Sequence, residues 1–219
     1  HTTASDGALN PVDLVARALD AGVTQLAITD HDTVAGYQAA LAHYTQVCEK
    51  ITLIPGVELS CRWSGATIHI LGLGIDCEHP AMVAGLARLK EARLARAAKI
   101  SERLLAKGFE GALAGATEKA GNSQIGRPHF AAWMLEQGHV ATFAKAFDKY
   151  LGQGKVGDVK AFWPELAEVT SWIVDSGGVA VIAHPLHYRF TRMKLRRLVT
   201  DFETAGGGAI ELINGRQSA

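Results

Sequence analysis

The hydrophobic positions of the first 75 residues alternate between two spacings, and this alternation predicts helices and strands in turn. Asn10 and Pro11 are typical of a helix start, a capping side chain followed by proline at the first helical position. The predicted helices are residues 12–21 and 34–49, and the predicted strands are residues 25–29, 51–54 and 66–72. The second of these strands is expected to end in residues 55–58, Pro-Gly-Val-Glu.

From about Pro80 to Trp163 helical spacing replaces the strand pattern, and alanine, leucine and charged residues dominate. After this stretch the pattern predicts a helix at 166–176, a strand at 178–183, a basic helix at 191–204 and a strand at 209–213. We therefore expect a first core segment (1–79), an all-helical insertion (80–163), and a second, incomplete core segment (164–219).

Strands separated by helices predict an α/β fold with parallel pairing and right-handed crossovers. In a β/α barrel or an open parallel sheet, side chains at the carboxyl ends of the strands meet at one edge. Several polar residues of this chain follow short apolar strands. The sequence therefore predicts a site at that edge, built from residues far apart in the chain.

Composition and charge exclude little. The 22 basic and 22 acidic residues balance, so bulk charge favours neither nucleic acid nor a membrane as partner. Cys48, Cys61 and Cys77 form no Cys-x-x-Cys pair, which favours a reducing, cytoplasmic compartment. No apolar run reaches the roughly 18 residues of a membrane span, and no signal peptide is visible. Because the chain begins at His1 and ends soon after a strand, we expect it to be trimmed at both ends.

Three polar residues, Asp30, His31 and Asp32, leave the strand at 25–29. Burying such residues without partners costs several kcal/mol, so their place indicates a site; a helix cap at Asp32 with a surface histidine is the alternative. Glu58 follows Gly56, which allows close backbone approach, and its carboxylate could bridge two metals. An exposed glutamate at a strand end is the alternative there.

His69 lies in a strand on the face opposite Ile68 and Ile70, a setting equally typical of a histidine in the core. His184 ends an apolar strand, and Pro185 forces a loop after it. His1 and Asp6, taken alone, are more typical of a frayed terminus. Imidazole and carboxylate ligands together favour zinc, manganese or iron. The other histidines lack comparable settings: His43, His79, His139 and His187.

Arg93 and Arg96 lie three residues apart on one face of a predicted helix, flanked by Leu89 and Ile100. A half-apolar face with two arginines suits a phosphate clamp, and ordinary solvated charge is the alternative. A dense basic run near the end of the chain is better explained as a solvated helix face, although it is where salt-dependent RNA contacts would lie if RNA is a substrate. It comprises Arg189, Arg192, Lys194, Arg196 and Arg197.

Together these segments resemble the PHP (polymerase and histidinol phosphatase) family of metal-dependent hydrolases. Within it they are most similar to the bacterial nucleoside 3′,5′-bisphosphate phosphatases and their 5′-to-3′ exoribonuclease relatives. The resemblance covers nearly the whole chain. It is carried by residues 1–7 (HTTASDG), 29–32 (TDHD), 55–58 (PGVE), 68–73 (IHILGL), 127–130 (RPHF), 150–151 (YL), 154–155 (GK) and 183–185 (AHP).

The resemblance implies a distorted, seven-stranded β/α barrel, a helical insertion that caps the substrate, and three divalent ions. His1 and Glu58 would hold the first ion, Glu58, His69 and His184 the second, and Asp6 and His31 the third. It also implies that Arg127, His129 and Lys155 bind substrate with Arg93 and Arg96. The chain lacks the first histidine of the family's His-x-His start and its final Asp-x-His pair. Pro128, residues 186–189 and residues 156–158 also differ from the family pattern.

The hypothesis from the sequence is a metal-dependent phosphoesterase in which a metal-bound hydroxide attacks a phosphate monoester of a nucleoside 3′,5′-bisphosphate. The hypothesis adds a second possible activity, the trimming of short RNA in the 5′-to-3′ direction. Asp30, His31 and Glu58 are the expected catalytic residues, with Asp30 in a proton-transfer or orienting role. A non-catalytic metal-binding module and a histidinol-phosphate phosphatase are the alternatives. No membrane or protein partner is expected, and the sequence leaves open the metals, the cellular substrate, self-association and whether the trimmed chain is active.

Overall fold

The computed structural model describes residues 1–44, 50–160 and 162–212. The chain divides into two compact units, one formed by residues 1–89 and 163–219 and the other by residues 90–162. The long helix α3 (Pro80–Leu105) begins at the expected start of the insertion, and the division into units falls within it. The strands lie in the first unit.

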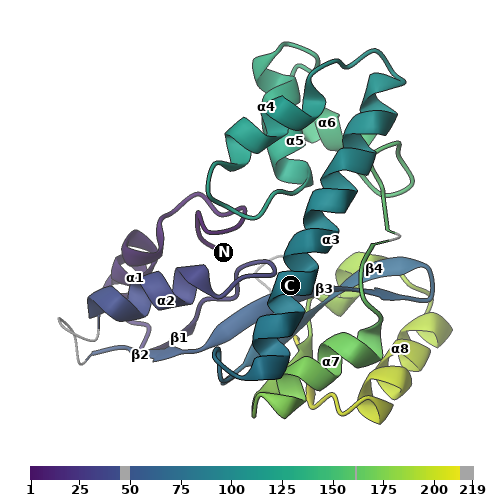
Figure 1. The fold of residues 1–219 in the computed structure, drawn as a ribbon. Helices are drawn as coiled ribbons and strands as arrows, with labels where there is room; N and C mark the ends of the chain where they lie inside the picture. The colour runs from purple at the N-terminus through teal and green to yellow at the C-terminus, as the bar shows by residue number, and fades with distance from the viewer. Residues whose placement is uncertain (45–49, 161, 213–219) are drawn as a thin grey trace. The chain divides into compact units, whose positions relative to one another are not determined.

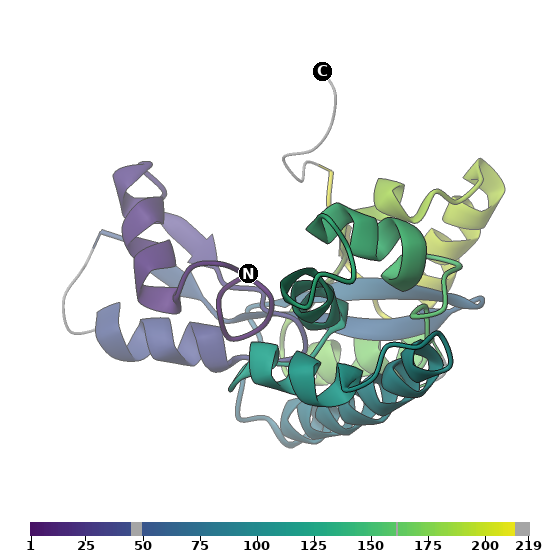
Figure 2. The same ribbon diagram turned by 90° about the horizontal axis from the view of Figure 1, so that it is seen from above.

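The N-terminal part of the first unit follows the predicted alternation of helix and strand. Helix α1 (Pro11–Asp20) starts at Asn10, whose side chain accepts a hydrogen bond from the Asp13 amide, as expected for a cap. Strands β1 (Gln25–Ala27) and β2 (Thr52–Ile54) pair in parallel. Helix α2 (Ala35–Tyr44) lies beside α1 (Figure 2), and the two share a core around Val15, Ile28 and Ala40. Residues 45–49 of the predicted second helix lie outside the described residues.

The predicted strand at 51–54 is β2, which ends at Ile54, but residues 56–58 begin a further strand, β3 (Gly56–Trp63), that the sequence did not predict. A two-residue turn connects β3 to β4 (Ala66–Leu73), which corresponds to the strand predicted at 66–72. Ser64 and Gly65 have φ values of 46° and 74°, the positive values that a tight antiparallel hairpin requires. The chain therefore reverses within two residues, and β3 and β4 pair along their whole length.

The second sheet has the order β3-β4-β5-β6, with β5 at Val179–Ile182 and β6 at Ala209–Ile210. β5 and β6 are parallel, connected through α8 (Arg192–Thr204), whereas β4 pairs antiparallel with both β3 and β5. The expectation of parallel pairing throughout is therefore wrong. A hairpin forces antiparallel pairing, and the long excursion between β4 and β5 lets the chain return in either direction.

The two faces of the β3–β4 hairpin differ sharply in chemistry. Helix α7 (Leu166–Asp175) packs against β3, β4 and β5 (Figure 1), and it covers a face of apolar side chains that includes Leu59, Ile68 and Ile70. The opposite face carries Glu58, Ser60 and His69, because successive side chains of a strand point to opposite faces. The sheet thus presents polar side chains on a rigid apolar support.

The described strands form two separate sheets and no closed barrel. An isolated parallel bridge between His31 and Glu58 connects the segment after β1 to β3. The α/β class is as predicted. Within the described residues, no helix is both long and apolar enough to cross a membrane.

The second unit consists of helices, in agreement with the predicted helical character of this stretch. Besides part of α3 it contains α4 (Ala112–Ala120), α5 (Arg127–Glu136), α6 (Phe143–Ala146) and the short π-helical turn η1 (Phe147–Leu151). These helices enclose a core of their own that includes Leu104, Phe130 and Met134. Its role as a substrate cap stays a prediction.

We predict that Ile70→Ala destabilises the fold by about 2–5 kcal/mol, because a fully buried side chain between Leu59 and Ile182 leaves a cavity. Ile70→Val, the control, should cost about 0.5–1.5 kcal/mol. Urea denaturation of both variants measures the difference. Equal, small losses would contradict the packing described for this face.

Candidate metal centre

The N-terminal loop is held by Asp30, which is 1% exposed. Oδ1 of Asp30 accepts hydrogen bonds from the Thr2 amide (2.5 Å) and the Ser5 hydroxyl (2.7 Å), and Oδ2 accepts one from the Thr2 hydroxyl (2.6 Å). Gly36 leaves room for this carboxylate, since a Cβ there would lie 2.0 Å from Asp30 Oδ2. Asp30 thereby fixes the loop that carries His1 and Asp6. Of the two roles expected for Asp30, these contacts favour the orienting one.

The segment after β1 is fixed to β3 by backbone hydrogen bonds on both sides of His31. The Glu58 amide donates to Asp30 O (3.1 Å), and the Asp32 amide donates to Glu58 O (2.9 Å). Asp32 has a φ of 54°, and its carboxylate accepts a hydrogen bond of 2.6 Å from the Ser60 amide. These contacts hold His31 beside Glu58.

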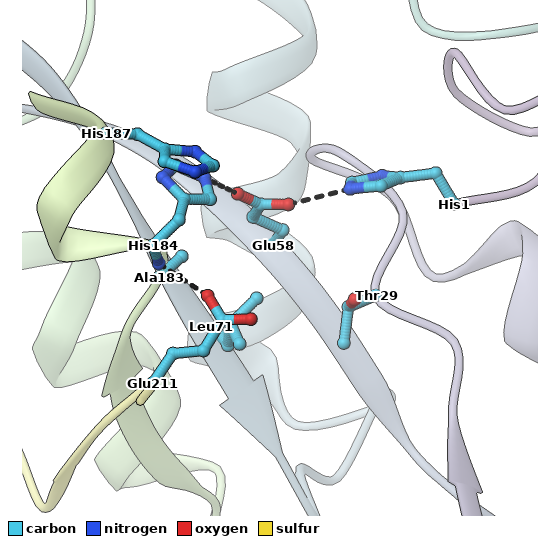
Figure 3. Close-up of a pocket in the computed structure, with 8 residues that line it drawn as sticks. All are labelled: His1, Thr29, Glu58, Leu71, Ala183, His184, His187 and Glu211. Carbon is cyan, nitrogen blue, oxygen red and sulfur yellow. Dashed lines mark hydrogen bonds and ion pairs between the residues drawn. The ribbon is translucent and has the colours of Figure 1, made fainter. Parts of the chain in front are cut away.

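Glu58 lies at the centre of the site, with a different pair of imidazoles near each carboxylate oxygen. His69 Nδ1 and His184 Nε2 lie 3.1 and 2.9 Å from Oε1. His1 Nε2 and His31 Nδ1 lie 2.9 and 4.0 Å from Oε2. Figure 3 shows Glu58 between His184 and His1. The structure thus brings together four histidines that were predicted from four separate segments.

Asp6 completes the set of predicted ligands. Its carboxylate oxygens lie 3.7 Å from His1 Nδ1 and 3.9 Å from His31 Nε2. All six predicted ligand residues therefore lie in one cluster. The alternatives of a frayed terminus for His1 and Asp6, and of an exposed glutamate for Glu58, do not describe this arrangement.

The electrostatics of Glu58 depend on these histidines. Burial by itself would raise the pKa of the Glu58 carboxyl, but the charge of His31 and the contacts with His1, His184 and His69 outweigh it and hold the pKa well below the usual value. Burial likewise would lower the pKa of His1, and the contact with Glu58 raises it instead. The buried carboxylate is therefore kept in the ionised form that a metal ligand requires.

The spacing of the donor atoms suits divalent ions. Glu58 Oε1, His69 Nδ1 and His184 Nε2 are separated from one another by 2.9, 3.1 and 3.3 Å. Ligand atoms about 2.1 Å from a tetrahedral ion lie roughly 3.4 Å apart. Two further groups have ligand atoms within 4.8 Å of one another, one formed by His1, Asp6 and His31 and the other by His31, Glu58 and His69.

A cavity of about 410 Å³ opens at this cluster. Sequence reasoning missed two ionisable residues that line it, His187 and Glu211. The His187 ring stacks on His184 with a centroid distance of 5.2 Å, and Glu211 accepts a hydrogen bond from the His184 amide. No motif spacing marks these two residues, although His187 lies only three positions after a predicted ligand.

The predicted substrate-binding residues lie in the helical unit. Arg93, Arg96 and Arg127 donate to the backbone carbonyls of Ile125 (3.1 Å), Val159 (2.7 Å) and Leu151 (3.1 Å). Burial lowers the pKa of Arg127, Asp158 opposes this shift, and the nearby charge of Arg93 adds to it. Arg93 and Arg127 are thus two guanidinium groups close enough to repel each other.

His129 and Lys155 differ from these arginines in their surroundings. The ring of His129 is buried, and its Nδ1 accepts a hydrogen bond of 2.9 Å from the Gly126 amide at the start of α5. Lys155 is exposed in the loop after η1. His129 therefore contributes to the start of α5, whatever else it binds.

Comparison with known proteins shows the family of the chain. The PHP domain family matches residues 1–161. The chain belongs to the PHP family. A 5′-3′ exoribonuclease of Haemophilus influenzae is 42% identical over 218 residues, which cover the whole chain and 78% of that relative. A 3′,5′-nucleoside bisphosphate phosphatase of Chromobacterium violaceum is 41% identical over the whole chain and 76% of its own length.

A solved structure resembles the PHP fold described above over the whole chain. It is an amidohydrolase from Chromobacterium violaceum that holds sulfate and no metal, with a TM-score of 0.90, 40% identity and 76% of its chain covered. The family predicted from the sequence is therefore confirmed.

We predict that Glu58→Ala weakens divalent-metal binding by more than the roughly 100-fold that loss of an outer-shell partner can cause, because both oxygens of the central ligand are removed. Elemental analysis and Mn²⁺ titration of the purified PHP protein measure this. Glu203→Ala, which removes an exposed carboxylate of α8, is the control. Metal content equal to that of the unaltered protein would contradict the central role of Glu58.

Proposed function

We propose that this PHP protein is a metal-dependent phosphoesterase that hydrolyses a phosphate monoester of nucleoside 3′,5′-bisphosphates and trims short RNA from the 5′ end. The observation that carries the proposal is the buried Glu58 carboxylate, with one pair of imidazoles near Oε1 and another near Oε2. A carboxylate in this position could hold two divalent ions, and paired divalent ions stabilise the attacking and leaving oxygens when a phosphate ester is hydrolysed.

The names of the relatives support this substrate class. One relative is named a 3′,5′-nucleoside bisphosphate phosphatase and another a 5′-3′ exoribonuclease. A nucleoside bisphosphate has the chemistry of one nucleotide unit of RNA with a phosphate at each end. Both names therefore describe breaking a phosphate ester next to a nucleoside that carries another phosphate.

We assign three ions to the centre, each a manganese, zinc or iron ion. His1 and Glu58 would hold the first, Glu58, His69 and His184 the second, and Asp6 and His31 the third. The mutual distances of 2.9–3.3 Å among the donors of the second site support this assignment most directly. Mixed imidazole and carboxylate donors suit these metals.

The residues of the chain have distinct tasks in this proposal. Ions at the centre would lower the pKa of bound water and offset charge on the phosphoryl oxygens. Glu58 and His31 would offer their own oxygen and nitrogen atoms as ligands. Asp30 orients the loop that carries His1 and Asp6. Because Glu58 is buried, water does not compete for its oxygens.

We further propose that the arginines of the helical unit bind a phosphate of the substrate, together with His129 and Lys155. Arg93 and Arg96 are buried, and the lowered pKa of Arg127 reflects burial first and its cationic neighbour Arg93 in addition. A bound dianion stabilises buried, neighbouring cations through strong charge-assisted hydrogen bonds. The sulfate in the structure of the Chromobacterium violaceum relative supports anion binding in this family.

We further propose a barrel architecture with a substrate cap and a cytoplasmic location for this activity. Residues 80–163 would act as a substrate cap, and the complete fold would be a distorted barrel. The bridge between His31 and Glu58, which joins the two sheets, supports the barrel. The free thiols of Cys61 and Cys77 support a reducing, cytoplasmic compartment, and Cys48 lies outside the described residues.

The deciding experiment is an assay of the metal-loaded protein on three substrates: a nucleoside 3′,5′-bisphosphate, histidinol phosphate and a 5′-phosphorylated oligoribonucleotide. We expect turnover of the first and the third, and its loss in Glu58→Ala. Turnover of histidinol phosphate alone would favour the alternative phosphatase. Metal binding without turnover of any of the three would favour a structural PHP module.

We predict that Arg93→Ala raises KM for a bisphosphate by about 10–100-fold, the equivalent of a lost hydrogen bond to a charged group. KM for a simple phosphate monoester should change far less. Arg103→Ala is the matched control, because Arg103 lies on the same helix and also donates to a backbone carbonyl, that of Val156. Equal effects of Arg93→Ala on both substrates would contradict the clamp.

A further inference from the structure

His184 adopts a backbone conformation that its sequence disfavours. Its φ and ψ are 32° and 55°, in the left-handed region that residues other than glycine rarely occupy. Pro185 follows, and a residue before proline avoids helical conformations of this kind. A ligand residue in a disfavoured conformation persists only where its surroundings hold it there. Two contacts of the described residues do so.

The first contact comes from Glu211, just beyond β6. Its amide donates to Ile182 O (3.0 Å), which fixes the backbone of Glu211 beside the end of β5. From there Oε2 accepts a hydrogen bond of 2.5 Å from the His184 amide. Figure 3 shows this bond at the edge of the cavity. A carboxylate bonded to a backbone N–H is among the stronger hydrogen bonds of a protein.

The second contact comes from Tyr188, at the end of the short 3₁₀ helix Pro185–Tyr188. Its hydroxyl donates to Ala183 O (2.9 Å) and accepts a hydrogen bond from the His69 amide (2.9 Å). The Ala183 amide in turn donates to His69 O (3.1 Å). The phenol therefore ties the middle of β4 to the residue before His184.

Both contacts act on the histidines that flank Oε1 of Glu58. His69 Nδ1 and His184 Nε2 lie 3.3 Å apart. Glu211 also lines a cavity that, in the proposed function, receives a phosphate. A carboxylate there repels the substrate, so its presence needs another explanation. The hydrogen bond to the His184 amide supplies one.

We propose that Glu211 and Tyr188 are positioning residues, which hold His184 and His69 at the separation that one divalent ion requires. The inference rests on the metal centre of the proposed function. Neither residue would be a ligand of the ion. Glu211 fixes the conformation of His184, and Tyr188 fixes the distance between the two ligand-bearing segments.

The test is a Co²⁺ titration of the full chain with two readouts. Calorimetry measures the affinity, and visible absorption reports the geometry around the ion. We expect Glu211→Ala to weaken binding of one ion by about 10–100-fold and to change its spectrum, the usual size of an effect from a residue behind a ligand. Glu211→Gln keeps an oxygen acceptor and should retain most of the affinity. Tyr188→Phe removes the hydrogen bond to Ala183 O and should weaken the binding of the same ion.

Glu203→Ala, an exposed carboxylate on α8, is the matched control, and thermal unfolding of metal-free protein monitors the fold. Unchanged affinity and spectrum in Glu211→Ala would overturn the proposal. So would an equal loss in Glu211→Gln, or a loss of all ions that follows a lower unfolding temperature of the metal-free variant.

The outcome also separates this proposal from the proposed function. Unaltered protein that binds Co²⁺ but hydrolyses none of the three substrates would overturn the activity and leave the positioning test valid. Unaltered protein that binds no divalent ion would overturn both.

Discussion

The structure of the first unit depends on one buried carboxylate. Glu58 is 3% exposed, and removing an ionised carboxylate from water is costly unless it is paired. Four imidazoles within 4.0 Å of its oxygens supply the pairing. The segments that carry these imidazoles are therefore constrained to meet at one place on β3. Divalent ions would strengthen the same constraint, because they occupy the same donor atoms.

The supports around the cluster follow a single pattern, in which carboxylates and a phenol bind backbone amides next to ligands. Asp30 binds the Thr2 amide beside His1, Asp32 binds the Ser60 amide, and Glu211 binds the His184 amide. None of these three carboxylates lies at the centre of the cluster. Asp30 and Glu211 fix segments outside regular strands, and Asp32 ties the segment after β1 to β3. The cluster therefore combines residues on β3 and β4 with residues on secured loops.

The proposed function would let one PHP scaffold serve the two activities named among its relatives. Ions at the centre would act on the phosphate ester that is broken, which is a monoester in a nucleoside bisphosphate and a diester in RNA. The second phosphate and the rest of the chain distinguish the substrates, and their recognition would fall to cationic side chains elsewhere. Arg93 and Arg127, close enough to repel each other, have the charge that such recognition needs.

The sequence by itself predicted the α/β class and most of the helices and strands, because hydrophobic spacing is a local property. Its resemblance to the PHP family indicated the six residues that the structure gathers in one cluster. The Asn10 cap followed from local rules as well. Only the tertiary structure decided the antiparallel pairing of β3, β4 and β5, which places His69 in mid-strand, and the approach of Glu211 to His184. The pairing direction of strands depends on the path by which the chain returns to the sheet, and so does the contact between His184 and Glu211, which are 27 residues apart. Local hydrophobic spacing does not encode that path.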